Sequence, residues 1–213
     1  MFQTIFIGIS LLSNIFITSP AGVSNTHLLG ARSFSLENRY QDKWVSDVFK
    51  DNILLNMAYL RGYEKTSNVK WDAVEKPFHY DMTLKPGEVF AFHEDVLPQF
   101  AGKVAKTTNA HFNSYEGFKS DGWLVGDGVC HLASLINWAA RDAGLDVVSP
   151  TRHDFAAIPE VPKEYGVAIY NYPGMGYTNQ VQNLYITNNR SNDVIFEFDY
   201  NGKDLKVTVV EQK

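Results

Sequence analysis

Apolar and polar positions alternate along the chain with periods that change from region to region. Between residues 45 and 60, apolar side chains recur every three or four positions, which predicts a helix with one face toward a core. Residues 130–143 repeat this helical period, and Gly144 follows where a helix would end. Strands are predicted in four later apolar runs, at residues 167–170, 184–187, 194–198 and 205–210.

Turn signals connect these elements. Asn201-Gly202 predicts a hairpin between the last two strands. Lys85-Pro86-Gly87 is a turn signal before residues 88–93, which are predicted to form a short buried strand. Because helices come first and most strands last, we expect one α+β domain. Its helices, in the N-terminal half, would pack on a C-terminal antiparallel sheet.

The first residues differ from the rest of the chain. Residues 1–21 contain an apolar run that ends in Thr18-Ser19-Pro20-Ala21, with small residues suited to a cleavage site. They predict a signal peptide or an N-terminal anchor, with a buried first element of the domain as the alternative. The domain would then occupy residues 22–213, in an extracytoplasmic location, and would meet a membrane only through the N-terminal segment.

Composition narrows the function classes. The chain has 213 residues, of which 45% are hydrophobic, enough to build a packed core. Its net charge of −5 does not indicate a nucleic-acid-binding protein, since such proteins are usually basic. Histidines and the cysteine are suitable metal ligands, but no H-x-x-x-H or C-x-x-C pair occurs, and neither a metal nor a cofactor is predicted. The residues with suitable side chains are His93, His111, Cys130, His131 and His153.

The most informative motif is a glycine-rich turn that leads into the second predicted helix. It reads Gly126-Asp127-Gly128-Val129-Cys130-His131 and contains the only cysteine of the chain. A thiol at a helix start faces the positive end of the helix dipole, which lowers its pKa. His153 follows beyond this helix, in an order that several thiol hydrolases use. Cys130 is therefore a candidate nucleophile with His153 as its base, or else a buried structural residue.

Further residues complete this candidate catalytic site. Asp154 is adjacent to His153, and Asn171 lies on the following predicted strand, so either is a candidate for holding the imidazole. Asp127 serves as a catalytic acid or as an N-cap of the helix. His131 follows the cysteine directly and is the remaining candidate, although adjacent helix residues point in different directions.

A non-catalytic interpretation rests on aromatic residues. Four tyrosines surround the Pro173-Gly174-Met175-Gly176 segment and predict an aromatic-lined groove for a glycan or a peptide. They are Tyr165, Tyr170, Tyr172 and Tyr177. Trp123 and Trp138 are expected to be core residues.

Four segments in order resemble the VanW-like domain, a family named for an accessory protein of vancomycin-resistance clusters. They are residues 52–58, 84–92, 126–131 with 143–145, and 182–189 continuing through Asn201-Gly202. The resemblance spans residues 30–212. Its specific elements are Pro86-Gly87-Glu88-Val89-Phe90 and the Gly-x-Gly-x-Cys pattern that ends at Cys130.

The chain departs from the family's pattern at several positions. Asp127 stands where the family has the middle of three glycines, and His131 stands where it has glutamine. Arg152-His153 corresponds to an Arg and His pair with compressed spacing. A family acidic residue is replaced near residues 166–168.

The resemblance implies a bacterial-type cell-envelope protein. The order of a Cys-bearing helix, a histidine and a polar residue on the next strand also resembles transglutaminase-like and papain-like thiol enzymes. Two functions are thus open. One is a thiol amidase or transpeptidase-like enzyme acting on a cell-wall peptide amide. The other is a non-catalytic peptidoglycan- or glycan-binding module with Cys130 structural.

Overall fold

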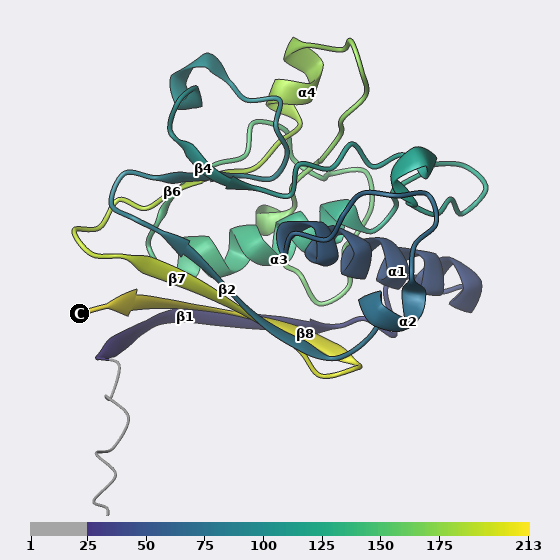
Figure 1. Ribbon diagram of the computed structural model, residues 1–213, viewed down its shortest axis with the longest axis horizontal. Helices are drawn as coiled ribbons and strands as arrows, with labels where there is room; N and C mark the ends of the chain where they lie inside the picture. The colour runs from purple at the N-terminus through teal and green to yellow at the C-terminus, as the bar shows by residue number, and fades with distance from the viewer. Residues whose placement is uncertain (1–24) are drawn as a thin grey trace, which may run out of the picture.

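The computed structural model describes residues 25–213, which form two four-stranded sheets with two long helices (Figure 1). The expected signal peptide or anchor, residues 1–21, lies outside the described residues. The strands are β1 Thr26–Ser35, β2 Phe78–Leu84, β3 Val89–Ala91, β4 Val104–Thr107, β5 Asp146–Val148, β6 Tyr185–Thr187, β7 Val194–Tyr200 and β8 Asp204–Gln212. The helices are α1 Lys43–Leu60, α2 Trp71–Val74, α3 Val129–Asp142 and α4 Tyr177–Val181.

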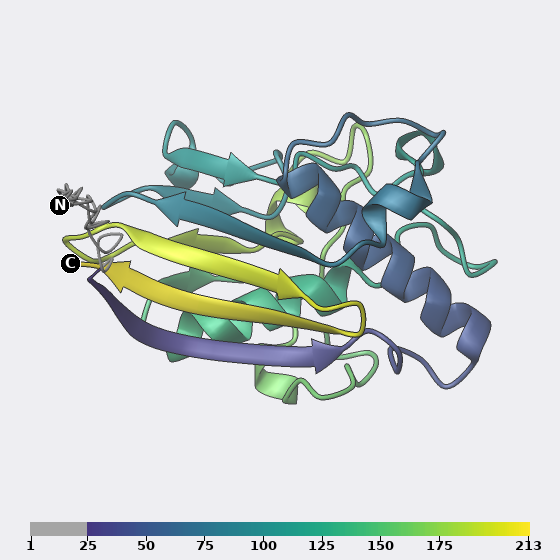
Figure 2. The same ribbon diagram turned by 60° about the horizontal axis from the view of Figure 1, so that its bottom comes forward.

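The first sheet is antiparallel, with the strand order β1-β8-β7-β2 (Figure 2). Tyr200 pairs with Leu205 across the predicted hairpin, and Gly202 in its turn has a φ of +98°. Burial alternates along β7, as expected for a strand with one face on a core. The hairpin prediction is confirmed.

In Figure 1, α3 lies between the two sheets, and α1 packs against α3 and extends to the right of the sheets. The predicted helices at 45–60 and 130–143 correspond to them closely. Gly30 of β1 lets α3 approach the first sheet, because a Cβ there would lie 3.2 Å from the Ala139 carbonyl oxygen. The α+β prediction is confirmed.

The second sheet has the order β4-β3-β6-β5, in which β3 pairs in parallel with β4 and antiparallel with β6. Thus β6, predicted as part of one C-terminal antiparallel sheet, belongs to a separate mixed sheet. Residues 167–170 run extended but form no named strand, and only a single bridge joins Val167 to Arg152. Within residues 25–213, no helix has the length and apolar character needed to cross a membrane.

Candidate functional site around Cys130

The glycine-rich turn allows α3 to begin against α1. Gly128 is the N-cap of α3 with a φ of +100°, and a Cβ there would lie 2.5 Å from the Phe49 carbonyl oxygen. Only glycine avoids both the strain and this clash. Asn52 of α1 fixes the turn by donating to the carbonyl oxygens of Asp127 (2.9 Å) and Lys119 (3.0 Å).

Cys130 is the second residue of α3, and its thiol is engaged by the backbone of Ile169. Sγ accepts from the Ile169 N–H at 3.4 Å and approaches the Ile169 carbonyl oxygen at 3.7 Å. Burial raises the pKa of the Cys130 thiol to about 11. The expected lowering of this pKa is therefore wrong, because loss of solvation outweighs the helix dipole.

Cys130 is the first of three polar side chains on one face of α3 that hold residues 165–169. The Ser134 hydroxyl accepts from the Val167 N–H at 2.9 Å, and Asn137 donates to the Tyr165 carbonyl oxygen at 2.8 Å. The spacing of three or four residues on a helix advances about 5–6 Å, close to the two-residue repeat of an extended chain. Together the three side chains join α3 to residues 165–169 by hydrogen bonds.

His153 meets His131 in the structure. Their ring centroids lie 6.2 Å apart in an edge-on arrangement, and both side chains are more than nine-tenths buried. Burial, assisted by the charge of Arg39, lowers the pKa of His131 to about 3, and its Nδ1 has no hydrogen-bond partner. Among the described residues, the hydrogen bonds of the Cys130 thiol go to Ile169 and none reaches an imidazole.

The His153 imidazole is oriented by a backbone carbonyl. Its Nδ1 donates to the Ala156 carbonyl oxygen at 3.1 Å, so the lone pair of the neutral ring lies on Nε2. Asp154 is exposed and lies near Arg152, 3.6 Å away. Asn171 is buried, and its side-chain oxygen accepts from Asn179 at 3.5 Å. Neither Asp154 nor Asn171 holds the imidazole by a hydrogen bond in the described structure.

Asp127 does not cap α3, since its N-cap is Gly128 and no side chain forms the capping bond. Burial and the nearby charge of Asp121 raise the pKa of Asp127 to about 6. One carboxylate oxygen of Asp127 is buried without a hydrogen-bond partner. Its carboxyl group is thus partly protonated near neutral pH.

A cavity of about 340 Å³ lies beside His153, inside the loop formed by residues 153–166. Its walls are mostly apolar, and sequence patterns gave no sign of it. Within residues 25–213, no three His, Cys, Asp or Glu side chains converge as metal ligands.

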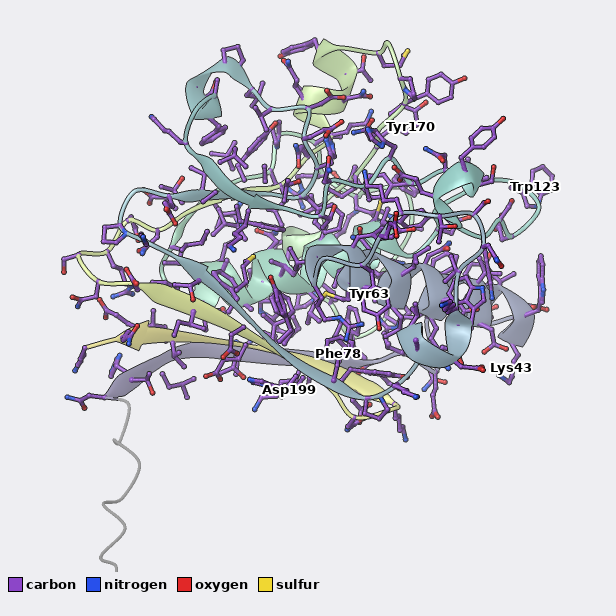
Figure 3. The ribbon with its side chains drawn as sticks, in the orientation of Figure 1. Lys43, Tyr63, Phe78, Trp123, Tyr170 and Asp199 are labelled. Carbon is purple, nitrogen blue, oxygen red and sulfur yellow. The ribbon has the colours of Figure 1, made fainter. Side chains whose placement is uncertain are left out.

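Exposed aromatic side chains gather away from the first sheet. Tyr170 and Tyr172 stack with centroids 6.5 Å apart, and Tyr177 is 71% exposed. Tyr165 instead stacks on Trp138, which packs against the core as expected. Trp123 is 91% exposed, so its predicted core position is wrong. Figure 3 shows Tyr170 and Trp123 toward the same upper side of the molecule.

The Trp123 loop has a defined shape. The Asp121 carboxylate accepts from the N–H groups of Trp123 (2.8 Å) and Leu124 (3.1 Å). Asp-Gly pairs are typical of turns, and Gly122 has a φ of +98°. This turn was not predicted from the sequence.

Comparison with known proteins gives a family. The sequence profile described as VanW like protein matches residues 64–210, more than half of the chain. No curated protein and no solved structure matches the chain.

Proposed function

The chain belongs to the VanW-like family, whose membership suggests a cell-envelope accessory protein, and we propose that it binds a cell-wall peptide or glycan without covalent catalysis. It would act outside the cytoplasm. The main support for this proposal is the exposed aromatic surface on residues 170–177. In addition, the Cys130 thiol is protonated and hydrogen-bonded to the backbone of Ile169.

The aromatic surface suits a flat or partly apolar ligand. Tyr170 and Tyr172 present nearly parallel rings, with 14° between their planes. Exposed rings contribute contact area at low entropic cost, and they stack on sugar faces and on peptide groups. Met175 adds a flexible apolar side chain next to them, 46% exposed.

The backbone beneath these rings is fixed before any ligand arrives. Asn179 accepts from the Tyr172 N–H (3.1 Å) and donates to the Tyr172 carbonyl oxygen (2.9 Å). The Asn179 amide also donates to Asp95 at 2.7 Å, which ties the segment to the loop after β3. A preorganised surface loses less conformational entropy on binding, which favours affinity.

A thiol amidase or transpeptidase-like enzyme is the second candidate. It is favoured by the place of Cys130 in the first turn of α3, where unpaired backbone N–H groups can stabilise an oxyanion. His131 lies in the same turn, and its ring centroid is 6.2 Å from that of His153. The Cys130 thiolate would attack an amide carbonyl, and His153 would take the thiol proton. With a pKa of about 11, however, roughly one thiol in ten thousand is ionised at neutral pH.

Co-sedimentation with purified cell-wall sacculi tests the binding proposal. We expect the wild type and Cys130→Ser to sediment with sacculi equally. Tyr170→Ala with Tyr172→Ala should weaken binding at least tenfold, whereas Tyr63→Ala, a half-exposed tyrosine on another surface, should leave it unchanged. Equal binding by the wild type and the double variant would contradict this proposal.

The rate of thiol alkylation by iodoacetamide distinguishes the enzyme. We expect slow alkylation that rises toward pH 11 and is unaffected by His153→Ala. A reactive thiol with an apparent pKa below the free value of about 8.5, raised by His153→Ala, would instead support catalysis.

A further inference from the structure

The cavity beside His153 is separate from the exposed tyrosines. It measures about 340 Å³, within the range of small-molecule sites, and lies inside the loop of residues 153–166. Ile158, Val161 and Pro162 line it with aliphatic groups. The Phe155 ring lies against the His153 imidazole, with centroids 3.9 Å apart.

Hydrogen bonds from residues outside the loop fix the shape of the loop around the cavity. Glu160 adopts a φ of +65°, a left-handed conformation that is unfavourable for a non-glycine residue. Its carboxylate accepts from Arg39 Nη2 at 2.6 Å and from the Ser35 N–H at 3.2 Å. Arg39 also donates to the Pro159 carbonyl oxygen at 3.2 Å. These bonds to the end of β1 and the segment after it maintain the loop shape without a ligand.

His153 is one of the polar residues that line the cavity. Because His153 Nδ1 donates to Ala156, the neutral imidazole can only accept at Nε2. Within the described part of the chain, Nε2 forms no hydrogen bond. Burial lowers the pKa of His153, which favours this neutral form. The charged Asp154 and Lys163 at the rim lie 4.0 Å apart, so neither sign of charge dominates there.

We propose that this cavity binds an uncharged secondary amide with a short aliphatic group, whose N–H donates to His153 Nε2. The aliphatic group lies against Ile158, Val161 and Pro162. A peptide unit next to a small aliphatic side chain has this chemistry. The proposal does not depend on the tyrosine surface binding cell wall, since the two sites share no residue.

Nuclear magnetic resonance of the His153 imidazole in the full chain tests this site with two matched probes. N-isobutylacetamide carries the N–H, and N-isobutyl-N-methylacetamide lacks it. We expect saturable shifts of the His153 ring with the first probe, and binding at least tenfold weaker with the second. The first probe should also lower the pKa of His153 further, because a donor at Nε2 competes with the proton.

Two variants check the location. Ile158→Trp fills the cavity and should abolish the shifts, whereas Tyr63→Ala, which does not line the cavity, should retain them. Absence of saturable shifts in the wild type, or equal binding of both probes, overturns the proposal. Because the probe comparison uses only the wild type, it stands even where Ile158→Trp fails to fold.

Discussion

At the scale of single residues, the surroundings of His93, His111 and His131 explain the direction in which the pKa of each is shifted. His93 is buried, and its Nε2 donates to the Gln182 carbonyl oxygen at 3.0 Å. His111 lies between the carboxylates of Glu116 (2.6 Å) and Glu94 (2.7 Å); although burial alone would lower its pKa, these bonds raise it. The His131 ring has neither a carbonyl nor a carboxylate partner, and its pKa is the most strongly shifted of the three.

We expect His131 to make the fold sensitive to acid. Its pKa of about 3 lies below the unfolded value of about 6.5, so its contribution to stability is present above pH 6.5 and is lost as pH falls toward 3. The loss between pH 7 and pH 4 is roughly 3 kcal/mol. Urea unfolding across this range measures it.

The matched variant is His131→Phe. Asp127, with its pKa raised to about 6, acts in the opposite direction because its protonation favours the folded state. Subtracting the pH profile of the variant from that of the wild type isolates His131. Identical slopes in the two proteins would exclude this role.

Gly128→Ala should destabilise the fold by roughly 3 kcal/mol, through positive φ and the contact with Phe49. Gly87→Ala is the control, because Gly87 also has a positive φ, +78°, but a Cβ there meets no atom within 4 Å. It should cost only about 1 kcal/mol. The difference between the two variants in the free energy of unfolding measures the effect of the close approach of α3 to α1. Equal destabilisation by the two variants would contradict this effect.

At the scale of elements, side chains of α3 bond residues 165–169 on one side, while the Ala168 N–H donates to the Thr151 carbonyl oxygen on the other. We expect Ser134→Ala to cost about 1–3 kcal/mol, because it leaves the buried Val167 N–H unpaired. Ser33→Ala, at an exposed position of β1, should be nearly neutral. Urea unfolding and exchange of the Val167 amide provide the measurement. Equal stability of the two variants would show that this hydrogen bond is dispensable.

The same contact explains which elements the sequence pattern could predict. The periods of α1, α3 and the β7–β8 hairpin reflect burial of one face and were predicted correctly. Residues 167–170 have the composition of a strand, but α3 side chains take up two of their N–H groups. β1 was not predicted, because apolar and polar residues do not alternate regularly in its exposed half and Gly30 interrupts the pattern.

For the site, the sequence placed Cys130 correctly at the start of a helix. It could not show that solvation would outweigh the helix dipole, since that depends on what covers the thiol. The approach of His131 to His153 depends on the loop of residues 153–166, whose shape is set by Arg39 and Glu160, 121 positions apart. Such long-range contacts leave no local pattern.

At the scale of the whole molecule, the family profile covers less than the folded unit. It begins at residue 64, whereas β1 and α1 lie before it and supply core residues such as Phe34 and Leu54. We expect a chain of residues 64–213 to lose cooperative thermal unfolding, while residues 25–213 retain it. Circular dichroism during heating decides this, and a cooperative transition in the shorter chain would show that β1 and α1 are accessory.

The pairing of β1 with β8 also bears on how the protein is made. Thr26 pairs with Gln212, so the first described strand finds its neighbour only when nearly every other described residue has been synthesised. Contacts between residues so far apart in the sequence form slowly, because the entropy of closing a long loop is lost before the strand pairing can stabilise the chain. A ribosome-bound chain therefore holds β1 without a partner. Until β8 has been made, the edge of β1 that later pairs with it stays open, which leaves it available to chaperones during synthesis.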